Sequence, residues 1–221
     1  MQPSDVTAPR LAFDDVVARL ATLPDRLPPP PAILMPVRMD AASAPRRALV
    51  PGATARAAAV LVLVIPLEGG EAGVVLTERV DRGGHHSGEV SFPGGSAEPE
   101  DPDPAATALR EATEEVGLDP IAAGVRVVGP LERFWIPVSD FQVTPILAVA
   151  TRRPVLVAAP DEVARIVFAP VAAFLPGAPI EIVERTVRDW PLRFGAYRVD
   201  GLLVWGATAR ILGQLGALLA R

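Results

Sequence analysis

The sequence predicts an α/β fold of the mixed α+β kind, in which helices pack on a mixed central β-sheet. Short runs rich in β-branched residues begin at residue 57, whereas residues 104–116 and 207–220 have helical periodicity. The strands and helices follow no regular strand–helix–strand rhythm, so an all-parallel sheet is not expected. We expect one main domain at residues 57–221, preceded by an N-terminal arm at residues 1–56.

The arm contains one candidate amphipathic helix, residues 11–23, followed by four consecutive prolines at residues 28–31. The apolar side of this helix consists of Leu11, Phe13, Val16, Val17 and Leu20. The prolines predict a stiff connector between this helix and the main domain. Residues 1–56 match no functional motif.

The main domain begins with a predicted β-hairpin. The runs "AAAVLVLVIPL" and "EAGVVLTERV" are separated by Gly69 and Gly70, which favour a turn. Further candidate strands lie in residues 125–136, 141–150, 161–175, 180–190 and 193–206.

Local signals mark both ends of the helix at residues 104–116. Asp103 is placed to cap the first turn, Pro104 suits the first helical position, and Gly117 suits the residue after the last turn.

Composition excludes several classes of function. The net charge of −5 argues against a surface that binds nucleic acid, although a small polyanion remains a possible substrate if a metal ion bridges it. The chain has no cysteine, which excludes disulfides, thiolate metal sites and cysteine nucleophiles. No apolar run reaches the length of about 20 residues that a membrane span needs, and the first residues lack a secretory-signal layout. We therefore expect a cytoplasmic protein without a membrane partner.

Three carboxylates share one face of the helix at residues 104–116. At about 100° per residue, Glu114 and Glu115 lie within about 60° on either side of Glu111. One interpretation is a solvated helix face, and the other is a site for Mg²⁺ or Mn²⁺. Crowded like charges cost stability, and only Arg110 is close in sequence to offset them, which favours the metal site. The run from Phe92 to Gly95 ends in a glycine pair that allows the backbone to approach a ligand.

The segment "REATEEVGL", Arg110–Leu118, resembles the second half of the Nudix box and has all its fixed positions. The first half has Asp101 in place of the usual Glu and one extra residue before Arg110. The upstream run "VLTERVDRGGHHSGEVSFPGG" resembles the signature of the coenzyme A pyrophosphatase branch of the Nudix hydrolases. It departs from that signature at Val80 and at Gly84, where the branch has Arg.

The resemblance implies a Nudix-type α/β/α sandwich and a role for each matching residue. Glu111, Glu114 and Glu115 would be metal ligands, together with the carbonyl oxygen of Gly95. Arg110 would orient the carboxylates, and Asp101 would balance Arg110. The candidate general base is Glu162. The alternative interpretation of Glu162 is an ordinary acidic residue at the start of a helix. The candidate substrate-binding residues are Arg79, Arg82, His86, Gly94 and Gly95.

The implied function is a metal-dependent pyrophosphohydrolase that cleaves coenzyme A or its acyl derivatives to 3′,5′-ADP and (acyl-)phosphopantetheine. One alternative is a Nudix hydrolase of ADP-ribose, dinucleotides or nucleoside triphosphates, which Val80, Gly84 and Glu89 leave open. Another is a non-catalytic module that binds a nucleotide or a partner. The expected partner is a small nucleoside diphosphate derivative, and a homodimer is possible.

Overall fold

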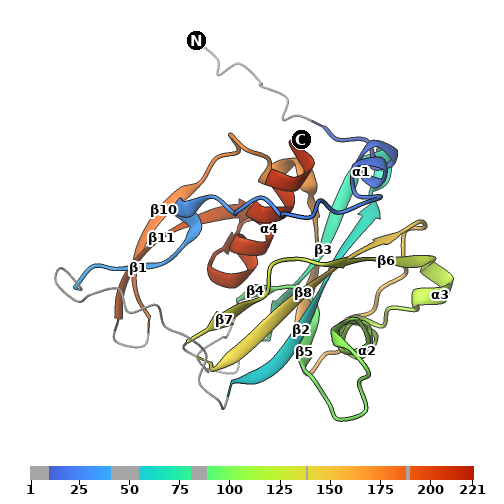
Figure 1. Cartoon of the computed structure of the whole chain (residues 1–221), viewed down its shortest axis with the longest axis horizontal. Helices are drawn as coiled ribbons and strands as arrows, with labels where there is room; N and C mark the ends of the chain where they lie inside the picture. The colour runs from blue at the N-terminus through green and yellow to red at the C-terminus, as the bar shows by residue number, and fades with distance from the viewer. Residues whose placement is uncertain (1–9, 41–54, 81–88, 138, 188–189) are drawn as a thin grey trace.

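The computed structural model describes residues 10–40, 55–80, 89–137, 139–187 and 190–221. These residues form a large mixed sheet, a smaller antiparallel sheet and four α-helices (Figure 1).

The large sheet contains eight strands. They are β2 (Arg56–Pro66), β3 (Ala72–Arg79), β4 (Val90–Ser91), β5 (Gly94–Ser96), β6 (Val125–Pro130), β7 (Phe134–Ile136), β8 (Phe141–Ala150) and β9 (Val163–Pro170). Strands β2 and β8 are parallel over nine residue pairs, from Arg56↔Phe141 to Val64↔Val149, and the other pairs in this sheet are antiparallel. The predicted mixed sheet and the β2–β3 hairpin are therefore confirmed.

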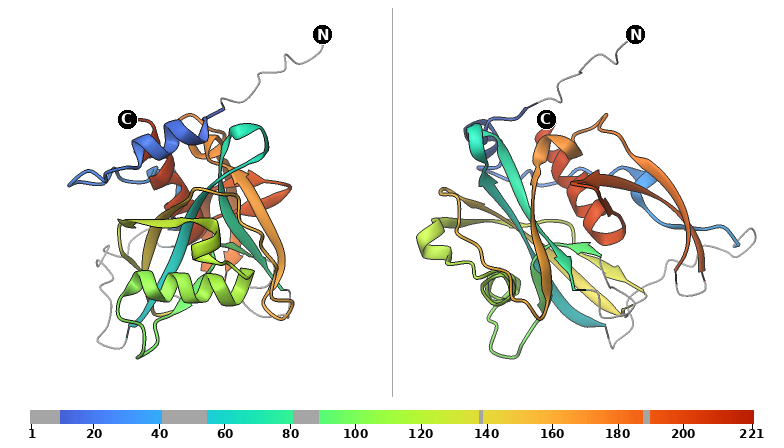
Figure 2. Two further views of the ribbon diagram at one scale, coloured as in Figure 1. Left: turned by 90° about the vertical axis from the view of Figure 1, so that its right-hand side faces the viewer. Right: turned by 180° about the vertical axis from the view of Figure 1, so that it is seen from behind.

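Both faces of the large sheet are buried. Along β2, Leu61 and Leu63 join the core beneath α2 (Pro104–Val116), whereas Val62 and Val64 join the core shared with α4 (Gly206–Leu219). This alternation explains why β2 is apolar on both sides, as strands covered on both faces are. Figure 2 shows α2 on one side of the sheet and α4 on the other.

Helix α2 has the predicted bounds. The Asp103 side chain accepts hydrogen bonds from the backbone N–H groups of Ala105 (2.8 Å) and Ala106 (2.9 Å). Gly117 ends the helix with a left-handed conformation, φ 63°. The short helix α3 (Pro120–Ala123) follows, and the sheet resumes at β6.

The smaller sheet was not predicted as a separate unit. It contains β1 (Val37–Arg38), β10 (Glu181–Val187), β11 (Trp190–Val199) and β12 (Leu202–Val204), with β11 in the centre. Helix α4 lies between the two sheets (Figure 2), and Tyr197 of β11 and Leu147 of β8 share one core cluster with Leu212 of α4.

The segment before β2 contributes to this core. Helix α1 (Phe13–Arg19) is shorter at both ends than the predicted 11–23, and Pro24 disfavours helical geometry at Leu23. Val16 and Leu20 are fully buried, as is Leu34 in the 3₁₀ turn Ala32–Leu34. The division of the chain at residue 57 stays a prediction.

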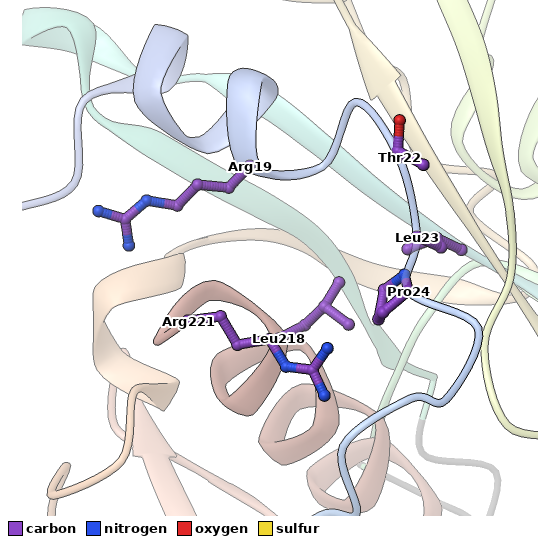
Figure 3. Close-up of a pocket in the computed structure, with 6 residues that line it drawn as sticks. All are labelled: Arg19, Thr22, Leu23, Pro24, Leu218 and Arg221. Atoms are coloured by element: carbon purple, nitrogen blue, oxygen red, sulfur yellow. The ribbon is translucent and has the colours of Figure 1, made fainter.

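A cavity of about 290 Å³ is lined by the end of α1 and the residues after it, and by the C-terminal end of the chain (Figure 3). Its lining residues are Arg19, Thr22, Leu23, Pro24, Leu218 and Arg221. The guanidinium groups of Arg19 and Arg221 point apart and donate to the backbone carbonyls of Leu219 and Arg26, respectively. We assign this cavity to packing between α1 and α4. Within the described residues, no helix combines the length and hydropathy needed to span a bilayer.

Candidate active site

Arg110 lies at the centre of the carboxylate cluster on α2. Its Nε and Nη2 donate to the two carboxylate oxygens of Asp101 at 3.2 and 3.1 Å, and Nη2 also donates to the Ser96 carbonyl at 2.9 Å. Its Nη1 donates to Glu111 at 3.2 Å and to Glu114 at 3.1 Å. The hydrogen bonds from Arg110 hold the pKa of Asp101 at about 2. Arg110 thus contacts two box carboxylates and is paired with Asp101.

Glu115 is the most deeply buried of the three glutamates, with 3% of its surface exposed. The Gly94 N–H donates to its Oε2 at 3.2 Å, and Arg79 Nη1 lies 3.6 Å from its Oε1. Burial raises the pKa of Glu115 to about 7 against the opposing effects of Gly94 and Arg79. Burial also raises the pKa of Glu111, which Arg110 opposes.

The glycine pair packs against other groups too closely for side chains. A Cβ on Gly94, whose φ is 154°, would lie 2.4 Å from the Ala59 carbonyl oxygen and 2.6 Å from Val60 Cα. A Cβ on Gly95 would lie 2.5 Å from Glu111 Oε1. The two glycines therefore bring backbone directly against β2 and the carboxylates, consistent with their predicted role beside a ligand.

Glu162 lies close to the same cluster. The Val80 N–H donates to its carbonyl at 3.1 Å, and the Ala159 N–H donates to the Glu115 carbonyl at 2.8 Å, so its loop is tied both to the end of β3 and to α2. The Glu162 side chain is exposed, and its charge helps to raise the pKa of Glu111 and of Glu115. The structure thus brings together the following predicted site residues: Arg79, Gly94, Gly95, Arg110, Glu111, Glu114, Glu115 and Glu162. Arg82 and His86 lie outside the described residues.

The donor chemistry of this cluster fits a hard divalent cation. Its donor atoms are carboxylate oxygens, and burial beside like charges disfavours the ionised form of Glu111 and Glu115, which a cation would relieve. Among the described residues, no three acidic side chains are gathered closely enough to hold an ion. Arg110 Nη1 contacts both Glu111 and Glu114. Glu114 is 58% exposed and has room to turn from Arg110.

The NUDIX domain profile matches residues 55–188. The chain belongs to the Nudix hydrolase family. It is 36% identical over 165 residues to "Uncharacterized Nudix hydrolase NudL" of Salmonella paratyphi B, covering 72% of this chain and 81% of that protein. It is also similar to two proteins of Arabidopsis thaliana, Nudix hydrolase 15, mitochondrial, and Nudix hydrolase 22, chloroplastic, at 36% and 37% identity over 164 residues and 70% of this chain. The match covers 55% and 52% of these plant proteins, so the chain spans about half of their length.

Among solved structures, the Nudix hydrolase RenU of M. smegmatis aligns with a TM-score of 0.44 and 24% identity, over 54% of this chain and 73% of that one.

One contact at the Nudix box was not predicted from the sequence. Thr107 is 1% exposed, and its hydroxyl donates to Asp101 Oδ2 at 2.9 Å. Thr107 thereby fixes the carboxylate that holds Arg110. The available signal was its position four residues before Glu111, on the same side of α2.

Proposed function

We propose that this Nudix protein is a metal-dependent pyrophosphohydrolase that cleaves the diphosphate of coenzyme A or its acyl derivatives. The observation that carries the proposal is the buried Glu115, held against the Gly94 N–H and beside Arg79, on the helix that also presents Glu111 and Glu114. A buried carboxylate with two further glutamates on its helix, beside a glycine pair and a partly exposed arginine side chain, suits a polyanionic substrate bridged by a cation.

In this proposal, some residues would hold the cation and others would bind the substrate. Glu111, Glu114 and Glu115 would hold Mg²⁺ or Mn²⁺, which supplies charge neutralisation of the diphosphate and activation of water. Arg110 keeps the carboxylates in place. Arg79, 40% exposed at its side chain, would bind phosphate oxygens.

The reaction proposed is hydrolysis of one phosphoric anhydride bond. The oxygen of a water molecule attacks one phosphorus, a new P–O bond forms, and the bond from that phosphorus to the bridging oxygen breaks. The leaving phosphate carries the bridging oxygen away, and Glu162 is the proposed acceptor of the proton from water. The products are 3′,5′-ADP and (acyl-)phosphopantetheine.

The substrate rests on the resemblance of residues 75–95 to the coenzyme A branch. Leu76, Thr77, Arg79, Gly88 and the Phe92–Gly95 run match its signature, whereas Val80 and Gly84 do not. In the structure Thr77 is 1% exposed and hydrogen-bonds the Ser91 side chain at 3.0 Å, which joins β3 to the strand leading into the glycine pair.

The test is chromatography of the products formed from coenzyme A, ADP-ribose and nucleoside triphosphates, each with Mg²⁺ or Mn²⁺. We expect 3′,5′-ADP and phosphopantetheine from coenzyme A, and neither product with Glu114→Gln. Cleavage of another substrate in place of coenzyme A would overturn the substrate but keep the reaction. No turnover of any of them would favour the non-catalytic alternative.

A further inference from the structure

Arg165 of β9 connects the large sheet to the smaller one. Strand β9 follows the Glu162 loop and pairs with β3, the strand that ends at Arg79. Its Nε donates to Glu78 Oε2 at 3.1 Å, and its Nη1 donates to Asp200 Oδ2 at 2.8 Å. Glu78 precedes Arg79 on β3, and Asp200 lies between β11 and β12. A single guanidinium thus links the end of β3 to the other sheet.

The alternation of β3 explains why this link bears on the site. Val74 and Leu76 point to the core shared with α4, whereas Val75 points to the core beneath α2. Glu78 continues the first side and Arg79 the second, where it meets Glu115 at 3.6 Å. A hold on Glu78 therefore fixes the orientation in which Arg79 faces α2.

Arg79 lies where the regular pairing of β3 with β9 ends. Arg165 is the direct cross-strand partner of Glu78, but Arg79 pairs with Val163, and the register shifts between Glu78 and Arg79. The extra residue is Ala164 of β9, so the ladder is disrupted on that strand. The end of β3 is held by backbone hydrogen bonds from the Arg79 N–H to the Glu89 carbonyl at 3.0 Å and from the Val80 N–H to the Glu162 carbonyl at 3.1 Å. Arg165 adds a side-chain contact to them at the last regular position.

The other anchor, Asp200, is set by a tight turn. Val199 pairs with Leu202, so Asp200 and Gly201 form a two-residue hairpin loop, with φ of 48° and 79°. Positive φ at both positions is the signature of the type I′ turn, for which Asp-Gly is a preferred pair. The carboxylate of Asp200 is thereby presented from a fixed backbone.

We propose that Arg165 is a positioning residue, which holds Glu78 against the Asp200–Gly201 turn so that Arg79 faces the carboxylate helix. The role of Arg79 toward substrate rests on the proposed function, whereas the mechanical role of Arg165 does not. The experiment below separates the two.

The variant is Arg165→Ala, and its matched control is Arg193→Ala, which removes another exposed arginine, paired with Glu184 at 3.8 Å within the smaller sheet. With coenzyme A and Mg²⁺, we expect Arg165→Ala to lower kcat/KM about tenfold, mainly through a higher KM. The thermal midpoint should stay within about 2 °C of wild type, because exposed ion pairs contribute little stability. Arg193→Ala should behave as wild type. Arg165→Lys should recover only part of the loss, because a single ammonium lacks the fork that contacts Glu78 and Asp200 together.

The decisive comparison uses Arg79→Gln. If Arg165 acts through Arg79, then Arg165→Ala causes no further loss in the Arg79→Gln background. An undiminished further loss, or an equal loss in Arg193→Ala, would overturn the proposal.

A readout independent of activity is hydrogen exchange at the amides of residues 78–80, which we expect to become at least about threefold faster in Arg165→Ala but not in Arg193→Ala. If wild type cleaves no substrate, the proposed function fails, and this exchange alone decides the role of Arg165. Unchanged exchange would overturn it.

Discussion

Burial and charge conflict at Glu115. It is almost fully buried on a helix whose exposed face carries Glu114, and among the described residues Gly94 and Arg79 offer it favourable contacts. The spacing of Glu111, Glu114 and Glu115 predicts their shared face, but not that Glu115 is the buried one. That burial depends on the pairing of β5 with β2 beside α2, which joins segments far apart in the chain.

The first prediction concerns the stability of the metal-free protein as a function of pH. The pKa of Glu115 is about 7 in the folded chain and 4.5 in its ordinary state. Because the folded pKa is raised, the associated stability is fully present below about pH 4.5 and is lost as the pH rises through 7. We expect the free energy of unfolding in EDTA to fall by up to about 3 kcal/mol between pH 4.5 and 8.

Urea unfolding at both pH values measures this difference. Glu115→Gln should abolish most of it, and Mg²⁺ at pH 8 should restore stability to the wild type. An equal pH dependence in Glu115→Gln would show that another group is responsible.

A second residue-scale prediction concerns Arg110. Arg110→Lys keeps the charge but loses the paired contact with Asp101, so the carboxylates of Glu111 and Glu114 lose their fixed partner. We expect kcat with Mg²⁺ to fall about 10–100-fold, as for other groups that orient metal ligands. Steady-state kinetics measures this, and activity within twofold of wild type would argue against an orienting role.

At the scale of elements, the sequence predicted the features that depend on neighbouring residues, such as the two ends of a helix. Asp103, Pro104 and Gly117 define both ends of α2 by chemistry within one turn of the helix. The smaller sheet is different, because β1 pairs with β11 across more than 150 residues of chain. Candidate strands were visible at residues 180–190 and 193–206, but their partners were not.

The two adjacent glycines of β5 yield a prediction. Gly94→Ala places a Cβ against the backbone of Ala59 and Val60, which cannot move without displacing β2. We expect it to reduce the free energy of unfolding by about 2–3 kcal/mol. In Gly95→Ala the atoms nearest to the new Cβ belong to the Glu111 carboxylate and not to backbone, so this variant should reduce activity with a smaller loss of stability.

Thermal unfolding and product formation, measured on both variants, separate the two effects. Equal destabilisation by both would contradict the different environments of Gly94 and Gly95.

At the scale of the whole molecule, α4 joins the two sheets and the segment before β2. Gln214 of α4 accepts a hydrogen bond from the Glu132 N–H at 3.2 Å and donates to the Pro28 carbonyl at 3.0 Å. The N-terminal segment is thus held to α4 by a buried amide as well as by apolar contacts. The sequence showed an amphipathic helix in this segment, but not the surface that it covers.

The last prediction tests whether residues 57–221 fold alone. Val16, Leu20 and Leu34 are fully buried in the core shared with α4, and each contributes about 1.5–3 kcal/mol by burial. Their sum is comparable to the total stability of a typical domain, so a chain starting at residue 57 should unfold at much lower urea concentration than the full chain, or fail to fold. In the full chain, Leu20→Ala combined with Leu34→Ala should lose at least about 4 kcal/mol. Ile33→Ala combined with Val37→Ala, at positions 51% and 52% exposed, should lose under about 1 kcal/mol. A truncated chain as stable as the full one would establish residues 57–221 as an independent domain. It would also show that burial of Val16, Leu20 and Leu34 does not stabilise that domain.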